Sequence, residues 1–202
     1  AISDLPEISV ENFKKENDLN EKEIIALLPG SREQEVEKML SLMLSVRDSF
    51  KNYQFVIAGA PSLPKEFYQK FVDDDVHFVS NKTYDLLRCS KAALVTSGTA
   101  TLETALLNVP EIVCYRTSTI SYEIGKRVVK NIKFISLVNL IMDREIVKEL
   151  IQKELNTENL VNKHQKILEG QKRDKMLENY ELLREKLGGK GASEHAAEII
   201  VN

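Results

Sequence analysis

Short apolar runs alternate with helical patterns along the first half of this chain. Five runs end at turn-forming residues and predict buried strands, at residues 24–28, 54–58, 76–79, 92–95 and 111–115. After the first run, apolar residues recur at three- and four-residue steps, which predicts an amphipathic helix with Val36, Leu40, Met43, Val46 and Phe50 on one face. Further helices are predicted at residues 10–17, 64–72, 84–90 and 99–108. Beyond residue 120 the pattern is mostly helical, with helices predicted at residues 121–130, 144–152, 158–169, 172–186 and 192–201.

Strands that alternate with helices predict a parallel sheet with right-handed crossovers. The fold class is therefore α/β, a Rossmann-like doubly wound sheet with C-terminal helices. We predict an N-terminal segment at residues 1–23, the Rossmann-like domain at 24–155 and a helical segment at 156–202. In the strand order 3-2-1-4-5-6, strands 1 and 4 are neighbours, and ligands bind beside their carboxyl ends. The loops that follow these two strands should converge.

Composition excludes several classes of protein. The 202 residues include 28 Lys and Arg against 31 Asp and Glu, a net charge of −3, which argues against a nucleic-acid partner. No metal is expected, because the three His residues are far apart in sequence and no CxxC pair occurs. Cys89 and Cys114 are predicted to be reduced core thiols. No apolar stretch approaches the roughly 18 residues that span a bilayer, so we expect a cytoplasmic protein.

The loop after the first strand, PGSR, is a candidate phosphate-binding turn. Gly30 and Ser31 form the turn, and Arg32 should point into the crevice, where a guanidinium can make charge-assisted bonds to phosphate oxygens. A surface arginine that opens the helix and pairs weakly with Glu35 would explain the same residues.

The loop after the fourth strand has small side chains that allow close approach of a ligand to the backbone. Ser97, Gly98, Thr99 and Ala100 open a helix, whose free N–H groups and positive dipole end suit a pyrophosphate. Simple N-capping by Ser97 or Thr99 is the alternative. Glu103 lies one turn further on and can accept hydrogen bonds from ribose hydroxyls, although a solvated helix carboxylate is equally consistent.

Other sequence features limit the chemistry. No GxGxxG follows the first strand and no GxxxxGK[ST] occurs, so we expect neither a dinucleotide cofactor nor a P-loop. The run at residues 73–75 is three Asp, similar to the motif with which some glycosyltransferases hold a divalent metal, but we interpret it as a solvated turn. Residues 116–133 hold five basic residues and one acidic residue, a pattern that suits anionic lipid, a phosphorylated substrate or an ordinary amphipathic helix.

Four motifs together resemble the lipid-A-disaccharide synthase family, glycosyltransferases of the two-Rossmann-domain (GT-B) type. They are LLPGSREQEV, TSGTATLETALLNVP, YRTSTISYEIGKRVVKNIKFISLVNLIMDREIVKELIQ and GGKGASEHAAEII. The resemblance covers the chain from Ile24 onward. It implies transfer of 2,3-diacylglucosamine from UDP to 2,3-diacylglucosamine 1-phosphate by inverting, metal-independent displacement. It also implies peripheral association with the cytoplasmic face of the inner membrane.

The resemblance assigns roles to particular residues. Gly30, Ser31, Arg32 and the residues from Ser97 to Ala100 would bind the UDP phosphates, and Glu103 the ribose. The backbone of Val79 and Ser80 would read the uracil. The remaining candidates for contacts with donor or acceptor are Tyr115, Arg116, Asn139, Arg144 and Glu145. A helix cap and a surface ion pair are the alternatives for Asn139, Arg144 and Glu145.

Members of the family are about twice as long as this chain. The resemblance therefore implies the donor-binding half, with the catalytic base in the missing N-terminal half and no transfer by this half alone. A C-terminal helix exchanged between two chains would give a homodimer. Two alternatives remain: another UDP-sugar transferase or epimerase of the same fold, and a non-catalytic nucleotide-sugar-binding module.

Overall fold

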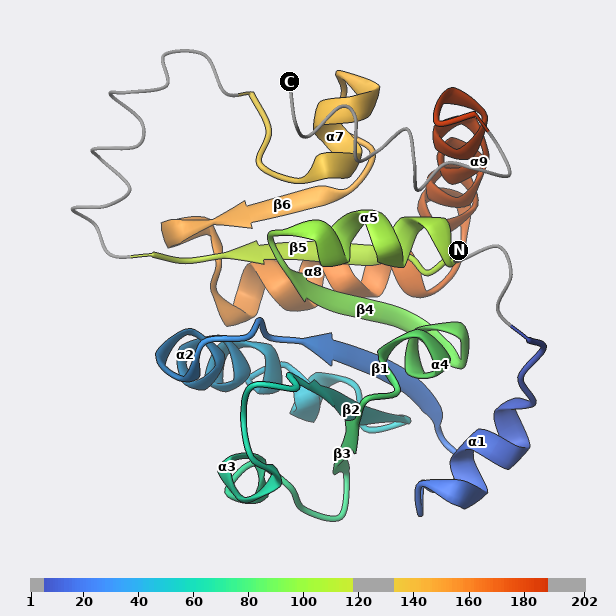
Figure 1. The fold of residues 1–202 in the computed structure, drawn as a ribbon. Helices are drawn as coiled ribbons and strands as arrows, with labels where there is room; N and C mark the ends of the chain where they lie inside the picture. The colour runs from blue at the N-terminus through green and yellow to red at the C-terminus, as the bar shows by residue number, and fades with distance from the viewer. Residues whose placement is uncertain (1–5, 118–132, 189–202) are drawn as a thin grey trace.

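A single parallel sheet organises the computed structural model, which describes residues 6–117 and 133–188. Its described strands are β1 (Glu23–Leu28), β2 (Tyr53–Gly59), β3 (Val76–Ser80), β4 (Ser90–Thr96), β5 (Glu111–Tyr115) and β6 (Lys148–Ile151). They lie in the order β3-β2-β1-β4-β5-β6, and all neighbours pair in parallel (Figure 1). The α/β fold class, the five predicted strands and the predicted order are confirmed.

Helices cover both faces of the sheet (Figure 1). In the described residues they are α1 (Val10–Glu16), α2 (Glu33–Leu44), α3 (Lys65–Gln69), α4 (Thr83–Arg88), α5 (Thr99–Leu106), α7 (Leu137–Met142), α8 (Thr157–Leu168) and α9 (Gln171–Lys186), with 3₁₀ turns η2 (Arg47–Ser49) and η3 (Gln152–Glu154). The helices predicted at residues 121–130 and 192–201 lie outside the described residues.

The continuous apolar runs are explained by burial on both faces. Ile25 and Leu27 of β1 pack in the core cluster that α2, α8 and α9 share. Ile24, Ala26 and Leu28 point the other way, into a second cluster that includes Phe13 of α1 and both leucines of α4. A parallel strand covered on both faces has no polar side, so its sequence does not alternate. The described C-terminal helices pack on the same core as the sheet.

The helix predicted at residues 144–152 is wrong, because that stretch contains β6. Asp143 ends α7 in the left-handed conformation, with φ of 50°. The Asn139 amide oxygen then accepts from the backbone N–H groups of Ile146, at 2.6 Å, and Val147, at 3.0 Å, and the extended chain pairs with β5. Ile146 and Leu150 are four residues apart and both buried, a spacing that fits a helix as well as an irregular edge strand.

Glu111, the first residue of β5, is a fully buried carboxyl group. Neither of its oxygens has a hydrogen-bond partner among the described residues. Burial raises the pKa of Glu111 well above its usual range, since the charged form has nothing to stabilise it. The carboxyl is therefore protonated in the fold at pH values where the unfolded chain ionises.

This burial predicts that stability falls with rising pH. Above about pH 4.3, where an unfolded Glu ionises, the folded chain binds more protons, so its free energy of unfolding declines until the folded pKa is passed. The Glu111→Gln variant lacks this dependence. Its free energy of unfolding, relative to that of the wild type, should therefore increase as pH rises. Urea unfolding across a pH series measures it, with Glu178→Gln, an exposed residue of α9, as the control. Parallel pH profiles for wild type and Glu111→Gln would contradict the prediction.

Candidate functional site

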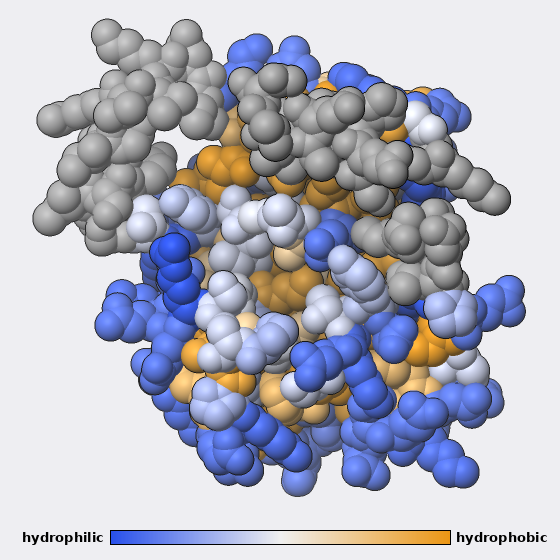
Figure 2. All heavy atoms as spheres, in the orientation of Figure 1, coloured by the Kyte–Doolittle hydropathy of each residue, from blue (hydrophilic) through white to orange (hydrophobic). Residues whose placement is uncertain are grey.

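The loops that follow β1 and β4 meet at the carboxyl edge of the sheet. The two strands are neighbours, and Figure 1 shows the loops into α2 and α5 at this edge. A Cβ atom placed on Gly30 would lie only 3.8 Å from Cγ2 of Thr96, so the loops are in contact. The predicted convergence is confirmed. In the orientation of Figure 1, the middle of the visible surface shows weakly polar residues around an apolar interior, with strongly hydrophilic residues toward the lower margin (Figure 2).

The loop after β1 presents an exposed arginine. Gly30 has φ of +104°, a conformation that favours glycine, and the Ser62 hydroxyl donates to the Ser31 carbonyl at 2.9 Å, which ties this loop to the one after β2. Arg32 is the N-cap of α2, and its side chain is 82% exposed. Its contact in the described structure is Glu35, at 3.4 Å. Such an exposed pair is weak, so the guanidinium can turn to an incoming anion.

The loop after β4 leaves the start of α5 without a side-chain cap. The N-cap is Gly98, with φ of +152° and open space where a Cβ would stand. The Ser97 hydroxyl donates instead to the Ile135 carbonyl, at 3.2 Å, and Thr101 turns its hydroxyl to the Gly98 carbonyl, at 2.8 Å. The capping alternative for Ser97 and Thr99 is therefore not observed. First-turn N–H groups at an uncapped helix start are suited to an anion.

Glu103 lies one turn into α5 and is half-buried. Its neighbour is Tyr84, in the first turn of α4. The pKa of Tyr84 is raised, first by burial and then by the negative charge of Glu103. Sequence reasoning gave Tyr84 no role. A signal was present, because an aromatic residue at the start of a helix that follows a parallel strand lies at the ligand-binding edge.

Four further candidates also lie at this edge. Val79 is buried and Ser80 exposed at the end of β3, two strands away from β1. Tyr115 ends β5 and is half-buried. Arg116 follows it, and its guanidinium donates to the carbonyls of Gln152 and Leu155, at 3.0 Å and 2.5 Å. Contacts with the chain thus already hold Arg116 in place.

The other three candidates lie elsewhere. Asn139 is fully buried, and its amide is bonded to the chain around β6. Arg144 and Glu145 come before β6, at the amino edge of the sheet. Arg144 donates to Asn179 at 2.7 Å, and Glu145 pairs with Lys148 at 3.2 Å. The structure does not bring these side chains together with the two loops.

The acidic run at residues 73–75 forms a turn before β3. Asp73 bonds Arg47, while Asp75 pairs with Lys22 at 2.6 Å. The pKa of Asp73 is lowered: burial raises it, but the Asp75 N–H and the Arg47 guanidinium together outweigh burial. Within residues 6–117 and 133–188, no three His, Cys, Asp or Glu side chains form a set that could hold a metal ion. Among the described helices, none has the length and apolar character that crossing a membrane requires.

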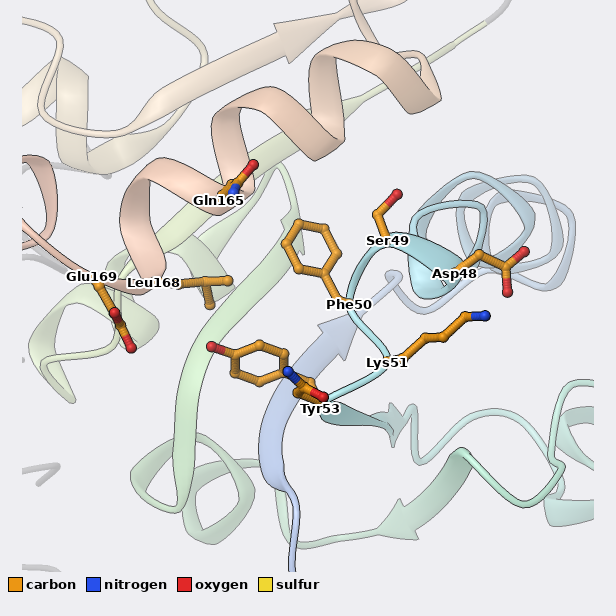
Figure 3. A pocket seen from close by; sticks show the side chains of 9 residues that line it. Asp48, Ser49, Phe50, Lys51, Tyr53, Gln165, Leu168 and Glu169 are labelled. Carbon is orange, nitrogen blue, oxygen red and sulfur yellow. The ribbon is translucent and has the colours of Figure 1, made fainter.

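A separate hollow of about 580 Å³ opens at the amino edge of the sheet, before β2 (Figure 3). Its lining comes from the η2 region, the start of β2 and α8, namely Asp48, Ser49, Phe50, Lys51, Asn52, Tyr53, Gln165, Leu168 and Glu169. These side chains are of mixed charge and present no converging set of anion ligands. The two loops after β1 and β4, rather than this hollow, carry the residue types that suit an anion.

The strand order defines a class, the Rossmann-like domains, and the solved structures that share this fold include GT-B glycosyltransferases. The solved structure of WaaG, a glycosyltransferase involved in lipopolysaccharide biosynthesis, has the same fold, with a TM-score of 0.58 at 18% identity over 98% of this chain and 52% of WaaG. The C-terminal CMP-Kdo binding domain of WaaA from Acinetobacter baumannii matches with a TM-score of 0.51 at 11% identity, over 89% of this chain and 96% of that domain.

Sequence comparison identifies the family. The family model described as lipid-A-disaccharide synthetase matches residues 3–201, and the chain belongs to this family. The lipid-A-disaccharide synthase of Syntrophus aciditrophicus is 38% identical over 182 residues, which cover 86% of this chain and 47% of that protein. The chain spans about half the length of the curated relatives it matches.

Proposed function

We propose that this chain is the donor-binding half of a lipid-A-disaccharide synthase. The whole enzyme would transfer 2,3-diacylglucosamine from UDP to 2,3-diacylglucosamine 1-phosphate and release UDP. Family membership and coverage of about half of each relative support this proposal. They favour it over a UDP-sugar epimerase or a non-catalytic binding module. Peripheral association with the cytoplasmic face of the inner membrane is part of the same proposal.

The observation that carries the proposal is the uncapped start of α5 together with the exposed Arg32 on the neighbouring loop. The first-turn N–H groups from Gly98 to Ala100 would bind the diphosphate, and Arg32 would swing from Glu35 to the same oxygens. Glu103 would accept from the ribose hydroxyls, with Tyr84 beside it. Ser80 would present its backbone to the uracil further along the edge.

These groups would act on the leaving group. As the glycosidic bond to the diphosphate breaks, negative charge grows on the UDP oxygens, and fixed N–H dipoles with a guanidinium stabilise that charge. The base that deprotonates the acceptor hydroxyl would come from the other half of the longer relatives. No cofactor is required by this displacement, and its inverted outcome follows from a single attack on the anomeric carbon.

UDP titration by calorimetry tests the site. Arg32→Ala should weaken UDP binding roughly tenfold to a hundredfold, because it removes charge-assisted bonds to phosphate. Glu103→Ala should weaken UDP binding less, because the lost carboxylate accepts hydrogen bonds from ribose hydroxyls, which are uncharged donors. Arg47→Ala, which deletes a guanidinium at the amino edge, is the matched control and should leave affinity unchanged. Equal UDP affinity in wild type, Arg32→Ala and Glu103→Ala would reject the assigned site.

A further inference from the structure

Five lysines surround one hollow at the amino ends of β5 and β6, which we term the lysine hollow. It has a volume of about 320 Å³ and is lined by Lys148 of β6, Lys163 and Lys166 of α8, Lys172 and Lys175 of α9, and by Ile112, Glu145, Ile146, Ile167, Met176 and Asn179. Its apolar members are almost fully buried. The floor is thus fixed by the core, and the ammonium groups form the rim.

The charges on the rim are poorly compensated. Lys148 pairs with Glu145 at 3.2 Å. The other four lysines have no carboxylate within ion-pair distance in the described part of the chain. Glu145 is the one carboxylate of the lining, against five ammonium groups. The lysine hollow is strongly cationic although the whole chain carries a net charge of −3.

Folding stability does not account for this arrangement. Lys172 and Lys175 stand near the N-terminus of α9, where positive charge opposes the helix macrodipole, and Asp174 is the acidic residue of that turn. The turn between α8 and α9 also brings these two lysines toward Lys163 and Lys166, where like charges repel. Within the described residues the fold gives these lysines one ion pair, between Lys148 and Glu145, and a bound anion would supply the missing counter-charge.

We propose that the lysine hollow binds the phosphate group of a phosphorylated ligand. Ammonium groups are compact charges with three donors each, and several of them can surround the oxygens of one phosphate from different sides. The volume matches the lower end of small-ligand sites. The bearer of the phosphate is either a soluble molecule or the headgroup of an anionic lipid, since both present the same oxygens.

This site is separate from the proposed UDP site. Ile112 and Lys148 stand at the beginnings of their strands, whereas Arg32 and Gly98 follow the ends of theirs. In a parallel sheet these are opposite edges. Occupation of one site therefore need not displace a ligand from the other, and each can be tested by variants that leave the other intact.

Two titrations of the 202-residue chain distinguish the two sources. The first adds inorganic pyrophosphate, with UDP saturating the nucleotide site, and follows backbone amide shifts around Gly170 by NMR. The second measures co-sedimentation with phosphatidylglycerol vesicles and with phosphatidylcholine vesicles. The quadruple variant K163Q/K166Q/K172Q/K175Q should weaken binding in the productive titration about tenfold or more. Rising salt concentration should weaken binding of the same probe by the wild type, because salt screens the lysine charges.

The matched control removes four exposed lysines that lie elsewhere, as K15Q/K38Q/K51Q/K153Q. It has the same net charge as the test variant and should bind as the wild type does. Selective loss of pyrophosphate binding in the test variant supports a soluble ligand, and selective loss of phosphatidylglycerol binding supports a lipid headgroup. Binding of neither probe, or an equal loss in both quadruple variants, would overturn the proposal. Circular dichroism establishes that both variants are folded.

Discussion

Replacing Asn139 with alanine should lower the free energy of unfolding by about 3 kcal/mol or more. The Asn139 side chain makes four hydrogen bonds in a fully buried site. It accepts from the N–H groups of Ile146 and Val147 and donates to the Val147 carbonyl and to Glu149, the latter two at 2.8 Å. Alanine leaves three backbone groups without partners, and each buried unsatisfied group costs about 1–3 kcal/mol.

The loss should spread through the network that joins α7 to β6. The Glu149 carboxylate is 6% exposed and also accepts from the backbone N–H groups of Ile135 and Ser136 and from the Ser136 hydroxyl. Without Asn139 it loses one of its four donors. The Ser97 hydroxyl donates to the Ile135 carbonyl, so this network also supports the loop at the start of α5.

Urea unfolding of wild type and Asn139→Ala measures the loss. Asn162→Ala is the control, because Asn162 is an exposed residue of α8 and its removal should change stability little. If Asn139 served only as a ligand contact, its replacement would reduce ligand affinity and leave the unfolding curve where it was. That result would contradict the structural role that its hydrogen bonds indicate.

The strands that lie inside the sheet could be predicted because burial leaves a direct mark on sequence. Residues 24–28 and 92–95 are apolar throughout, since both of their faces are covered. Their positions, with helices between them, led to a parallel sheet and to the neighbours β1 and β4. The small residues of PGSR and TSGT then predicted which edge would carry the ligand site.

The edge strand β6 could not be predicted in this way. Its conformation depends on Asn139, which is seven residues before Ile146 and for which the sequence predicts a helix cap or a ligand contact. Contacts made only in the folded chain decide between helix and strand there. The same applies to Tyr84, whose proximity to Glu103 arises only in the folded chain and not from any spacing in sequence.

The largest functional effect that we expect is the absence of transfer by this chain alone. Acid–base catalysis typically contributes about 10²–10⁴-fold, and orientation of two substrates contributes more. Under the proposed function both require the other half of the enzyme. The donor-binding half should therefore bind UDP and form no disaccharide from UDP-2,3-diacylglucosamine and the acceptor phosphate.

Mass spectrometry of the lipid products measures this, with a full-length family member as the positive control. UDP titration of the same sample establishes that the donor site is intact, so that a lack of product reflects the missing base rather than misfolding. Adding the N-terminal half of a full-length relative as a separate polypeptide should raise the rate only if the two halves dock, because the base must reach an acceptor held about 3 Å from the anomeric carbon. Disaccharide formation by this chain alone would show that it carries its own base. Glu103, the half-buried carboxylate at the carboxyl edge, would then be the first residue to replace, because a carboxylate at this position could act as the base.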